Sequence, residues 1–281
     1  MAEHPIDLAQ ARILVTNDDG IHAPGLKVLE RIAKRLSRDV WVVAPETEQS
    51  AASHALTLRR PLRVRRLAAR RFSVDGTPTD CALLGLRRIV PGRRPDLLLS
   101  GVNHGGNLGE DVTYSGTVAA ALEATLLGVR AVAFSQIRSG DGPVHWATAE
   151  HFAPDILARL TAFEWPRDVL VNVNFPALPP DQVREIRTCR QGRREAGVEI
   201  VEGTDPSGRP YVWIGDFSSD HSDHPESDLR ALAEGAISVT PLHIDMTHGA
   251  SLEQLSSPDA GSSRDRDLGG VVHGRPSWPP W

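Results

Sequence analysis

Two adjacent carboxylates, Asp18 and Asp19, follow residues 12–16, a short apolar run near the start of this 281-residue chain. Such a run favours a buried parallel strand, and ligands of open α/β sheets bind at the carboxyl ends of those strands. Adjacent carboxylates repel each other unless a cation lies between them, and hard cations such as Mg²⁺ prefer oxygen ligands. A helix N-cap is the alternative for either aspartate, and position alone leaves both interpretations open.

A Gly- and Asn-rich stretch, residues 101–111, follows another apolar run at residues 96–100. Asn103 and Asn107 offer amide oxygens and N–H donors, and the neighbouring glycines let backbone N–H groups approach a ligand closely. An ordinary turn is the alternative, because a glycine-rich loop alone is weak evidence for a site. If residues 96–100 form a strand of the same sheet, this loop opens into the same crevice as the aspartates.

Hydroxyl groups complete the candidate chemistry. Ser115, Gly116 and Thr117 precede an Ala-rich helical stretch, and the free N–H groups of a helix N-terminus bind anions. An ordinary Ser/Thr cap is the alternative there. Ser50 is a hydroxyl candidate in the loop of residues 45–53, although loop serines are usually only solvated. Acid, amide and hydroxyl oxygens beside an anion site together predict metal-assisted phosphoryl chemistry.

Alternating strands and helices must position these residues. Apolar residues recur with helical spacing from Pro24, and residues 40–44 are again apolar, so the chain opens with a βαβ unit and an α/β sheet. Thr77 and Asp80 predict a capped helix start. The other elements predicted for the body are a hairpin at residues 56–74, a helix at 116–127, a strand at 131–135, a helix at 145–163 and a strand at 169–174.

The pattern changes after Pro179. Short strand-like runs separated by polar loops predict a β-rich extension over residues 181–248, with too few apolar runs to fold alone, so we expect it to pack on a partner subunit. Residues 249–281 are rich in Ser, Gly, Asp and Pro and predict a disordered tail. The predicted organisation is therefore an α/β body of residues 1–180, the extension and the tail.

Composition excludes several classes of protein. The net charge is −5 and the pI is about 6.1, which argues against a general nucleic-acid binder. Neither a membrane-spanning stretch nor a signal peptide is visible, so we expect a cytoplasmic protein. Cys81 and Cys189 are too few for a disulfide scaffold. The sequence has neither a Gly-x-Ser-x-Gly nucleophile elbow nor a Gly-x-Gly-x-x-Gly dinucleotide fingerprint.

Several motifs in order resemble the SurE family, the stationary-phase survival proteins that act as metal-dependent 5′/3′-nucleotidases. The resemblance covers roughly residues 11–248. The motifs that carry it are Asn17-Asp18-Asp19-Gly20, Val42-Val43-Ala44-Pro45 with Ser50, Gly76-Thr77-Pro78-Thr79-Asp80, Ser100-Gly101-Val102-Asn103 with Asn107-Leu108-Gly109, Tyr114-Ser115-Gly116-Thr117 and Thr240-Pro241-Leu242.

The resemblance implies a three-layer α/β/α Rossmann-like body with a mainly parallel sheet and a C-terminal β-rich extension. It implies a phosphomonoesterase that hydrolyses nucleoside 5′- and 3′-monophosphates with metal-activated water, one Mg²⁺ or Mn²⁺ per subunit, and a homodimer or homotetramer. The implied metal ligands are Asp18, Asp19, Ser50 and Asn103, with Asp18 and Asp19 as the catalytic pair. The implied phosphate contacts are Asn103, Asn107, Ser115, Gly116 and Thr117.

Three stretches depart from the family pattern, and one alternative function stays open. His104 and Gly106 stand where the family varies or often has Pro. The family sequence Arg-Ser-Gly is Gln49-Ser50-Ala51 here, so a basic side chain is missing near the substrate. Residues 216–228 are rich in Asp and His, which predicts either a second metal site or a solvated loop. The alternative to an enzyme is a non-catalytic nucleotide-binding regulatory module, which would have no need of paired carboxylates.

Overall fold

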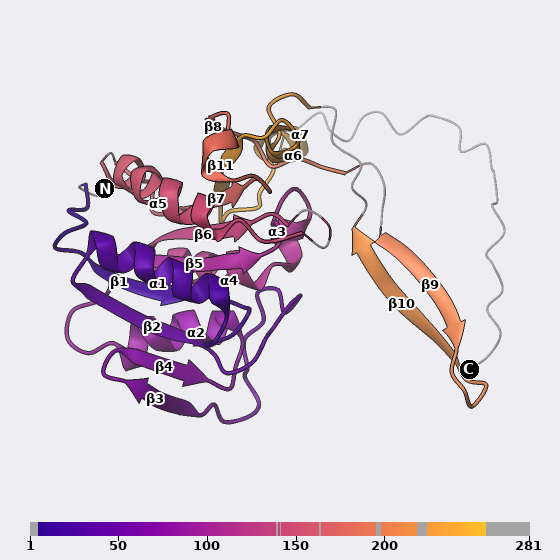
Figure 1. Cartoon of the computed structure of the whole chain (residues 1–281), viewed down its shortest axis with the longest axis horizontal. Coiled ribbons are helices and arrows are strands. Elements are labelled where there is room, and N and C mark those ends of the chain that lie inside the picture. The colour runs from indigo at the N-terminus through magenta and orange to yellow at the C-terminus, as the bar shows by residue number, and fades with distance from the viewer. Residues whose placement is uncertain are drawn as a thin grey trace. The chain divides into compact units, whose positions relative to one another are not determined.

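A nine-stranded sheet forms the centre of the computed structural model, which describes residues 5–138, 140, 142–162, 164–194, 198–217 and 224–256. The strand order is β3-β4-β2-β1-β5-β6-β7-β11-β8. Strands β4, β2, β1, β5, β6 and β7 are mutually parallel (Figure 1). Their bounds are β1 Arg12–Thr16, β2 Asp39–Pro45, β4 Arg71–Val74, β5 Leu97–His104, β6 Arg130–Gln136 and β7 Val169–Phe175.

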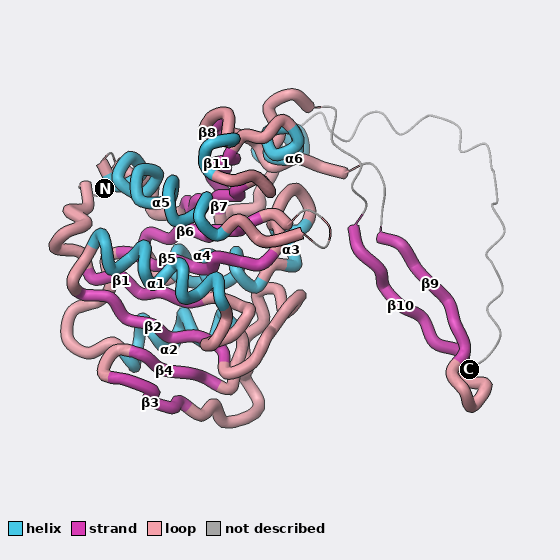
Figure 2. The backbone as a smooth tube through the Cα atoms, viewed as in Figure 1, coloured by secondary structure: helices cyan, strands magenta, loops and turns pink. Residues whose placement is uncertain are grey.

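Helices cover both faces of this sheet, as the alternation of apolar side chains requires (Figure 2). Ile13 and Val15 of β1 pack into a core shared with α1 (Pro24–Leu36) and α5 (Trp146–Thr161). Leu14 points to the opposite face, into a second core with α2 (Pro78–Leu84) and α4 (Gly116–Leu126). Successive strand side chains point to opposite faces, so a fully apolar strand needs cover on both. The predicted three-layer α/β/α body is confirmed.

The order of the strands reverses between β1 and β5. From β1 the chain moves outward to β2, then returns across the sheet to β5 on the other side of β1. Such a reversal leaves a crevice outside the carboxyl ends of the two strands. Asp18 follows β1, and Asn103 lies near the end of β5. The topology therefore brings the two polar stretches of the sequence to one edge of the sheet.

The predicted hairpin and capped helix are both present. Strand β3 (Val64–Ala68) pairs antiparallel with β4. Thr77 caps α2: its hydroxyl accepts the backbone N–H of Asp80 at 3.1 Å, and the Asp80 carboxylate accepts the backbone N–H of Thr77 at 2.9 Å. The helix continues into a π-helical turn over Gly85–Ile89. The short helix α3 (Asp111–Tyr114) precedes α4.

The C-terminal part adds the β-rich extension that the sequence predicts. Strand β11 (Ile237–His243) pairs antiparallel with β7, and β8 (Ile186–Thr188) pairs parallel with β11, so both widen the central sheet. Strands β9 (Val198–Thr204) and β10 (Pro210–Phe217) form a two-stranded antiparallel hairpin. The remaining elements are the 3₁₀ turn Pro180–Gln182 and helix α6 (Asp228–Ala233).

The chain divides into two units, Met1–Ile244 and Asp245–Trp281. The second unit contains helix α7 (Gly249–Ser256), which differs from the disorder predicted for residues 249–256. Residues 257–281, with Trp278 and Trp281, lie outside the described residues, as do residues 218–223 of the Asp/His-rich loop. Within the described ranges, no helix has the length and apolar character needed to cross a membrane.

Candidate active site

A cavity of about 390 Å³ opens at the carboxyl ends of β1 and β5. Its lining contains all four candidate metal ligands, Asp18, Asp19, Ser50 and Asn103, together with Asn107 and Ser115. The loops after β1 and β2, the end of β5 with the loop after it, and the start of α4 supply these residues. Residues from distant parts of the sequence therefore meet at the reversal of strand order, where an α/β sheet places its ligand site.

Asp18 is buried, with 6% of its surface exposed, and lies against the N-terminus of α4. The Thr117 hydroxyl and the Thr117 backbone N–H both donate to its carboxylate. Gly116 permits this approach, because a Cβ there would lie 2.8 Å from the Asp18 Cβ. Burial, together with the charge of Asp19, raises the pKa of Asp18 to about 7. The raised pKa means that ionisation of Asp18 costs free energy in the folded protein, and a bound cation would offset that cost.

Asp19 faces the cavity more openly. Its carboxylate accepts the backbone N–H of His104 at 3.2 Å. Burial raises the pKa of Asp19, and the nearby charge of Glu48 adds to that rise, whereas the His104 N–H opposes it. A carboxylate with a raised pKa is a better proton acceptor near neutral pH than an ordinary surface aspartate. Asp19 thus combines access to the cavity with basicity.

The loop after β2 brings Ser50 to the cavity. The backbone N–H of Gln49 donates to the Asp18 carbonyl at 2.8 Å, and the N–H of Ser53 donates to the Tyr114 carbonyl at 3.1 Å. These bonds tie the loop to the segment after β1 and to the end of α3. The exposed Ser50 hydroxyl donates to Glu48 at 2.7 Å, which leaves its oxygen lone pairs available to a cation.

Asn103 at the end of β5 and Asn107 in the loop after it differ in role. The Asn103 amide nitrogen donates to the Gly105 carbonyl at 3.1 Å, so its amide oxygen is the atom left for a ligand. The Asn107 amide nitrogen donates to the Ser135 hydroxyl at 2.7 Å, and its backbone N–H donates to the Asn174 side chain at 2.8 Å. Asn107 is therefore anchored to β6 and β7 as well as lining the cavity.

The expected phosphate contacts at the start of α4 need one correction. Ser115 lines the cavity and caps the helix, since its hydroxyl accepts the Val118 N–H at 3.1 Å. Thr117, by contrast, is fully buried and directs its hydroxyl to Asp18. Helix α4 approaches the end of β1 so closely that the Asp18 carboxylate lies at the N-terminus of this helix. Thr117 thus supports the aspartate, and its hydroxyl is not free for a phosphate.

The donor set suits a hard cation. Two carboxylates, a hydroxyl and an amide oxygen are the ligand types that Mg²⁺ binds, usually with retained waters. Among the residues described, no three His, Cys, Asp or Glu side chains gather in the way that a zinc site requires. The residues present therefore fit a divalent oxygen-binding cation rather than a thiolate- or imidazole-bound metal.

Arg194 lines the same cavity, although no pattern in the sequence marked it. Its guanidinium pairs with Asp111 at 2.8 Å and with Glu110 at 3.3 Å, and it donates to the Leu108 carbonyl at 3.1 Å. The loop after β2 lacks the basic residue usual in that motif. Arg194 reaches the cavity from a segment that is remote in sequence, and its charge is paired there with Asp111 and Glu110.

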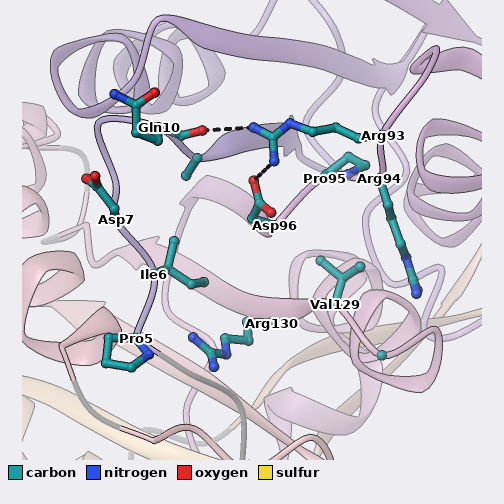
Figure 3. A pocket seen from close by; sticks show the side chains of 12 residues that line it. Pro5, Ile6, Asp7, Gln10, Arg93, Arg94, Pro95, Asp96, Val129 and Arg130 are labelled. Carbon is teal, nitrogen blue, oxygen red and sulfur yellow. Dashed lines mark hydrogen bonds and ion pairs between the residues drawn. The ribbon is translucent and has the colours of Figure 1, made fainter.

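A larger cavity of about 480 Å³ lies at the opposite, amino-terminal edge of the sheet (Figure 3). Its acid, Asp96, already accepts from Arg93 at 2.5 Å and from the Arg12 backbone N–H at 2.6 Å. Arg93 also donates to the Gln10 carbonyl at 2.8 Å. The candidate metal ligands are all remote from this cavity. Chemistry rather than size therefore identifies the smaller cavity as the candidate site.

A doubly wound sheet with an acidic cavity at its switch point defines an α/β protein whose candidate ligand site lies at the ends of β1 and β5. Sequence comparison gives the particular family. Residues 13–198 match the model of the survival protein SurE, and the chain belongs to the SurE family.

Three relatives illustrate the match. A protein of Paramagnetospirillum magneticum named 5′-nucleotidase SurE is 57% identical over 89% of this chain and 96% of its own length. Its namesake in Caulobacter vibrioides is 54% identical over 87% of this chain and 94% of its own length. The crystal structure of the SurE protein from Aquifex aeolicus superposes with a TM-score of 0.75 at 37% identity, over 88% of this chain and all of that one.

Proposed function

We propose that this chain is a divalent-metal-dependent 5′-nucleotidase that hydrolyses nucleoside 5′-monophosphates, and also 3′-monophosphates, to nucleoside and phosphate. The relatives' shared name, 5′-nucleotidase SurE, supports the nucleotidase class. The observation that carries the proposal is the pair Asp18 and Asp19 in one cavity with Ser50 and Asn103. A module that only bound nucleotides would gain nothing from paired, partly buried carboxylates, which cost folding free energy.

In this proposal Asp18, Asp19, Ser50 and Asn103 hold one Mg²⁺ or Mn²⁺ per subunit. The bound cation supplies positive charge, which polarises the phosphate ester and lowers the pKa of water. Thr117 and the N-terminus of α4 fix the Asp18 carboxylate, so it is positioned before substrate arrives. The Ser50 loop is held by its bonds to Asp18 and Tyr114. Preorganised ligands avoid reorganisation during the reaction.

The remaining residues position the substrate and the water. The phosphate lies against Ser115, Asn103 and Asn107, which line the cavity beside the start of α4. Asp19 orients the attacking water and accepts its proton. The new phosphorus–oxygen bond then replaces the bond to the sugar oxygen, which takes a proton from solvent water and leaves as the nucleoside hydroxyl.

We further propose that the protein acts in the cytoplasm, as a homodimer or homotetramer, and forms no stable complex with nucleic acid or membranes. The β9–β10 hairpin supports assembly, because Ile200, Trp213 and Ile214 are 65%, 66% and 78% exposed in the single chain. Exposed apolar groups of this size on one hairpin mark an interaction surface. The net charge of −5 disfavours nucleic acid.

Phosphate release from a panel of nucleotides tests the function. Purified protein treated with chelator is incubated with 5′- and 3′-monophosphates of each base, with and without added Mg²⁺ or Mn²⁺. Release that requires a divalent cation supports the proposal. Full activity in excess chelator contradicts the metal-dependent mechanism, and nucleotide binding without release would instead support the regulatory module.

A further inference from the structure

A second cavity, of about 380 Å³, adjoins the candidate active site. The two cavities share Asp19, Glu48 and His104, so one molecule can extend from one into the other. The far wall of the second cavity consists of Ala23, Pro24, Gly25 and Val144, together with the indole of Trp146. The ring centroids of His104 and Trp146 lie 6.1 Å apart, with an interplanar angle of 46°.

The fold holds Trp146 in this place. Trp146 is the first residue of α5, and its backbone N–H donates to the Val144 carbonyl at 2.9 Å. The half-buried ring packs against the edge of the main core. Gly25 lies beneath it, because a Cβ at that position would come 3.1 Å from the Trp146 Cη2. The aromatic wall is thus built by close packing of α1 against α5 and is not a freely rotating surface side chain.

The chemistry of the second cavity differs from that of the first. Its wall is aromatic and apolar, whereas the carboxylates of Asp19 and Glu48 lie where the two cavities meet. Those charges repel a phosphate placed in the second cavity, but they leave a neutral ring unaffected. Aromatic side chains bind nucleobases by stacking in a way that depends little on which base is present.

We propose that Trp146, with His104 at its edge, forms the subsite for the nucleobase of a nucleoside monophosphate. This inference rests on the proposed function, since it orients the nucleotide with its phosphate at Ser115 and its base on the Trp146 wall. The subsite takes purines and pyrimidines alike, because stacking reads the π face and not the hydrogen-bonding edge of the base. Trp146 is thereby a specificity-determining residue that favours nucleotides over phosphate esters lacking a base.

Two substrates that differ only in the base test the subsite. Steady-state kinetics compare AMP with ribose 5-phosphate, which keeps the sugar and the phosphate. Loss of one stacking partner weakens binding roughly 5- to 100-fold, so Trp146→Ala should raise KM for AMP by about that factor and leave ribose 5-phosphate nearly unchanged. The matched variant Trp146→Phe keeps an aromatic ring and should retain most of the wild-type KM. His104 is exposed, so the variant His104→Ala should raise KM for AMP by a smaller factor than Trp146→Ala does.

Equilibrium binding of adenosine, measured by calorimetry, gives a readout that needs no turnover. Trp146→Ala should weaken adenosine binding, whereas wild-type affinity that persists in the variant overturns the inference. An equal increase in KM for AMP and for ribose 5-phosphate also overturns the inference, because it indicates a structural role for the indole. If Trp146→Ala lowers Tm, the same comparison is made with His104→Ala. Failure of the proposed function is distinct, since the wild type would then release phosphate from neither substrate.

Discussion

Replacement of Asp18 by Asn should remove a pH dependence of stability from the metal-free protein. Burial raises the pKa of Asp18 to about 7, against 3.8 for an ordinary aspartate. Between those pH values the folded protein holds a proton that the unfolded chain has released, so the free energy of unfolding falls as pH rises from about 4 to 7. The difference between about 7 and 3.8 corresponds to roughly 4 kcal/mol, at 1.36 kcal/mol for each pH unit.

Urea unfolding in chelator at pH 5, 6, 7 and 8 measures this effect. Asp18→Asn keeps the shape of the side chain and an oxygen for the Thr117 hydroxyl but cannot ionise. The free energy of unfolding of the variant should therefore rise relative to that of the wild type as pH rises. Comparison of the two proteins cancels the titrating groups that do not interact with Asp18. Asp155→Asn on the exposed side of α5 is the matched control. Added Mg²⁺ at pH 8 should restabilise the wild type more than Asp18→Asn. Parallel stability profiles for wild type and Asp18→Asn would refute the reasoning.

Three other outcomes are expected. Asp19→Asn should lower kcat at least 10- to 100-fold, and near-wild-type turnover in a steady-state assay would remove it from the catalytic pair. Thr117→Ala should weaken Mn²⁺ binding about fivefold in calorimetry, because one hydrogen bond to Asp18 is lost. The control variant Thr117→Ser keeps the hydroxyl and should keep the wild-type affinity. An unchanged Mn²⁺ affinity in Thr117→Ala would contradict the supporting role of Thr117. Light scattering at micromolar concentration should find a dimer or tetramer that Trp213→Asp weakens; a wild-type monomer would refute assembly through the hairpin.

Local patterns in the sequence predict most of the body. The apolar run at residues 12–16 is strand β1, and the capping pair Thr77 and Asp80 starts α2 as expected. Both predictions depend on neighbouring residues alone, and short-range periodicity carries that information. The convergence of Asp18 and Asn103 on one edge also follows from the parallel βαβ topology, because that topology fixes which strand ends lie together.

Long-range contacts could not be predicted in the same way. Arg194 reaches the cavity from 83 positions beyond Asp111, and nothing in its local sequence indicates that pairing. The role of Thr117 depends on how closely α4 approaches β1, which its capping position does not reveal. Strand β11 joins the central sheet through its pairing with β7, a partner that alternation of apolar residues does not specify. These features depend on tertiary packing.

The fully buried Asp228, at the start of α6, has a consequence for how this protein can be divided. Its carboxylate accepts the N–H of Gly109 at 3.1 Å and the N–H of Gly192 at 2.8 Å. The loop that ends at Gly109 also carries Asn107, so the last quarter of the chain helps to shape the cavity. The C-terminal part is thus not an interchangeable module: a fragment ending at residue 180, or a chimera with another C-terminal half, would inherit the carboxylates without the support that shapes their surroundings.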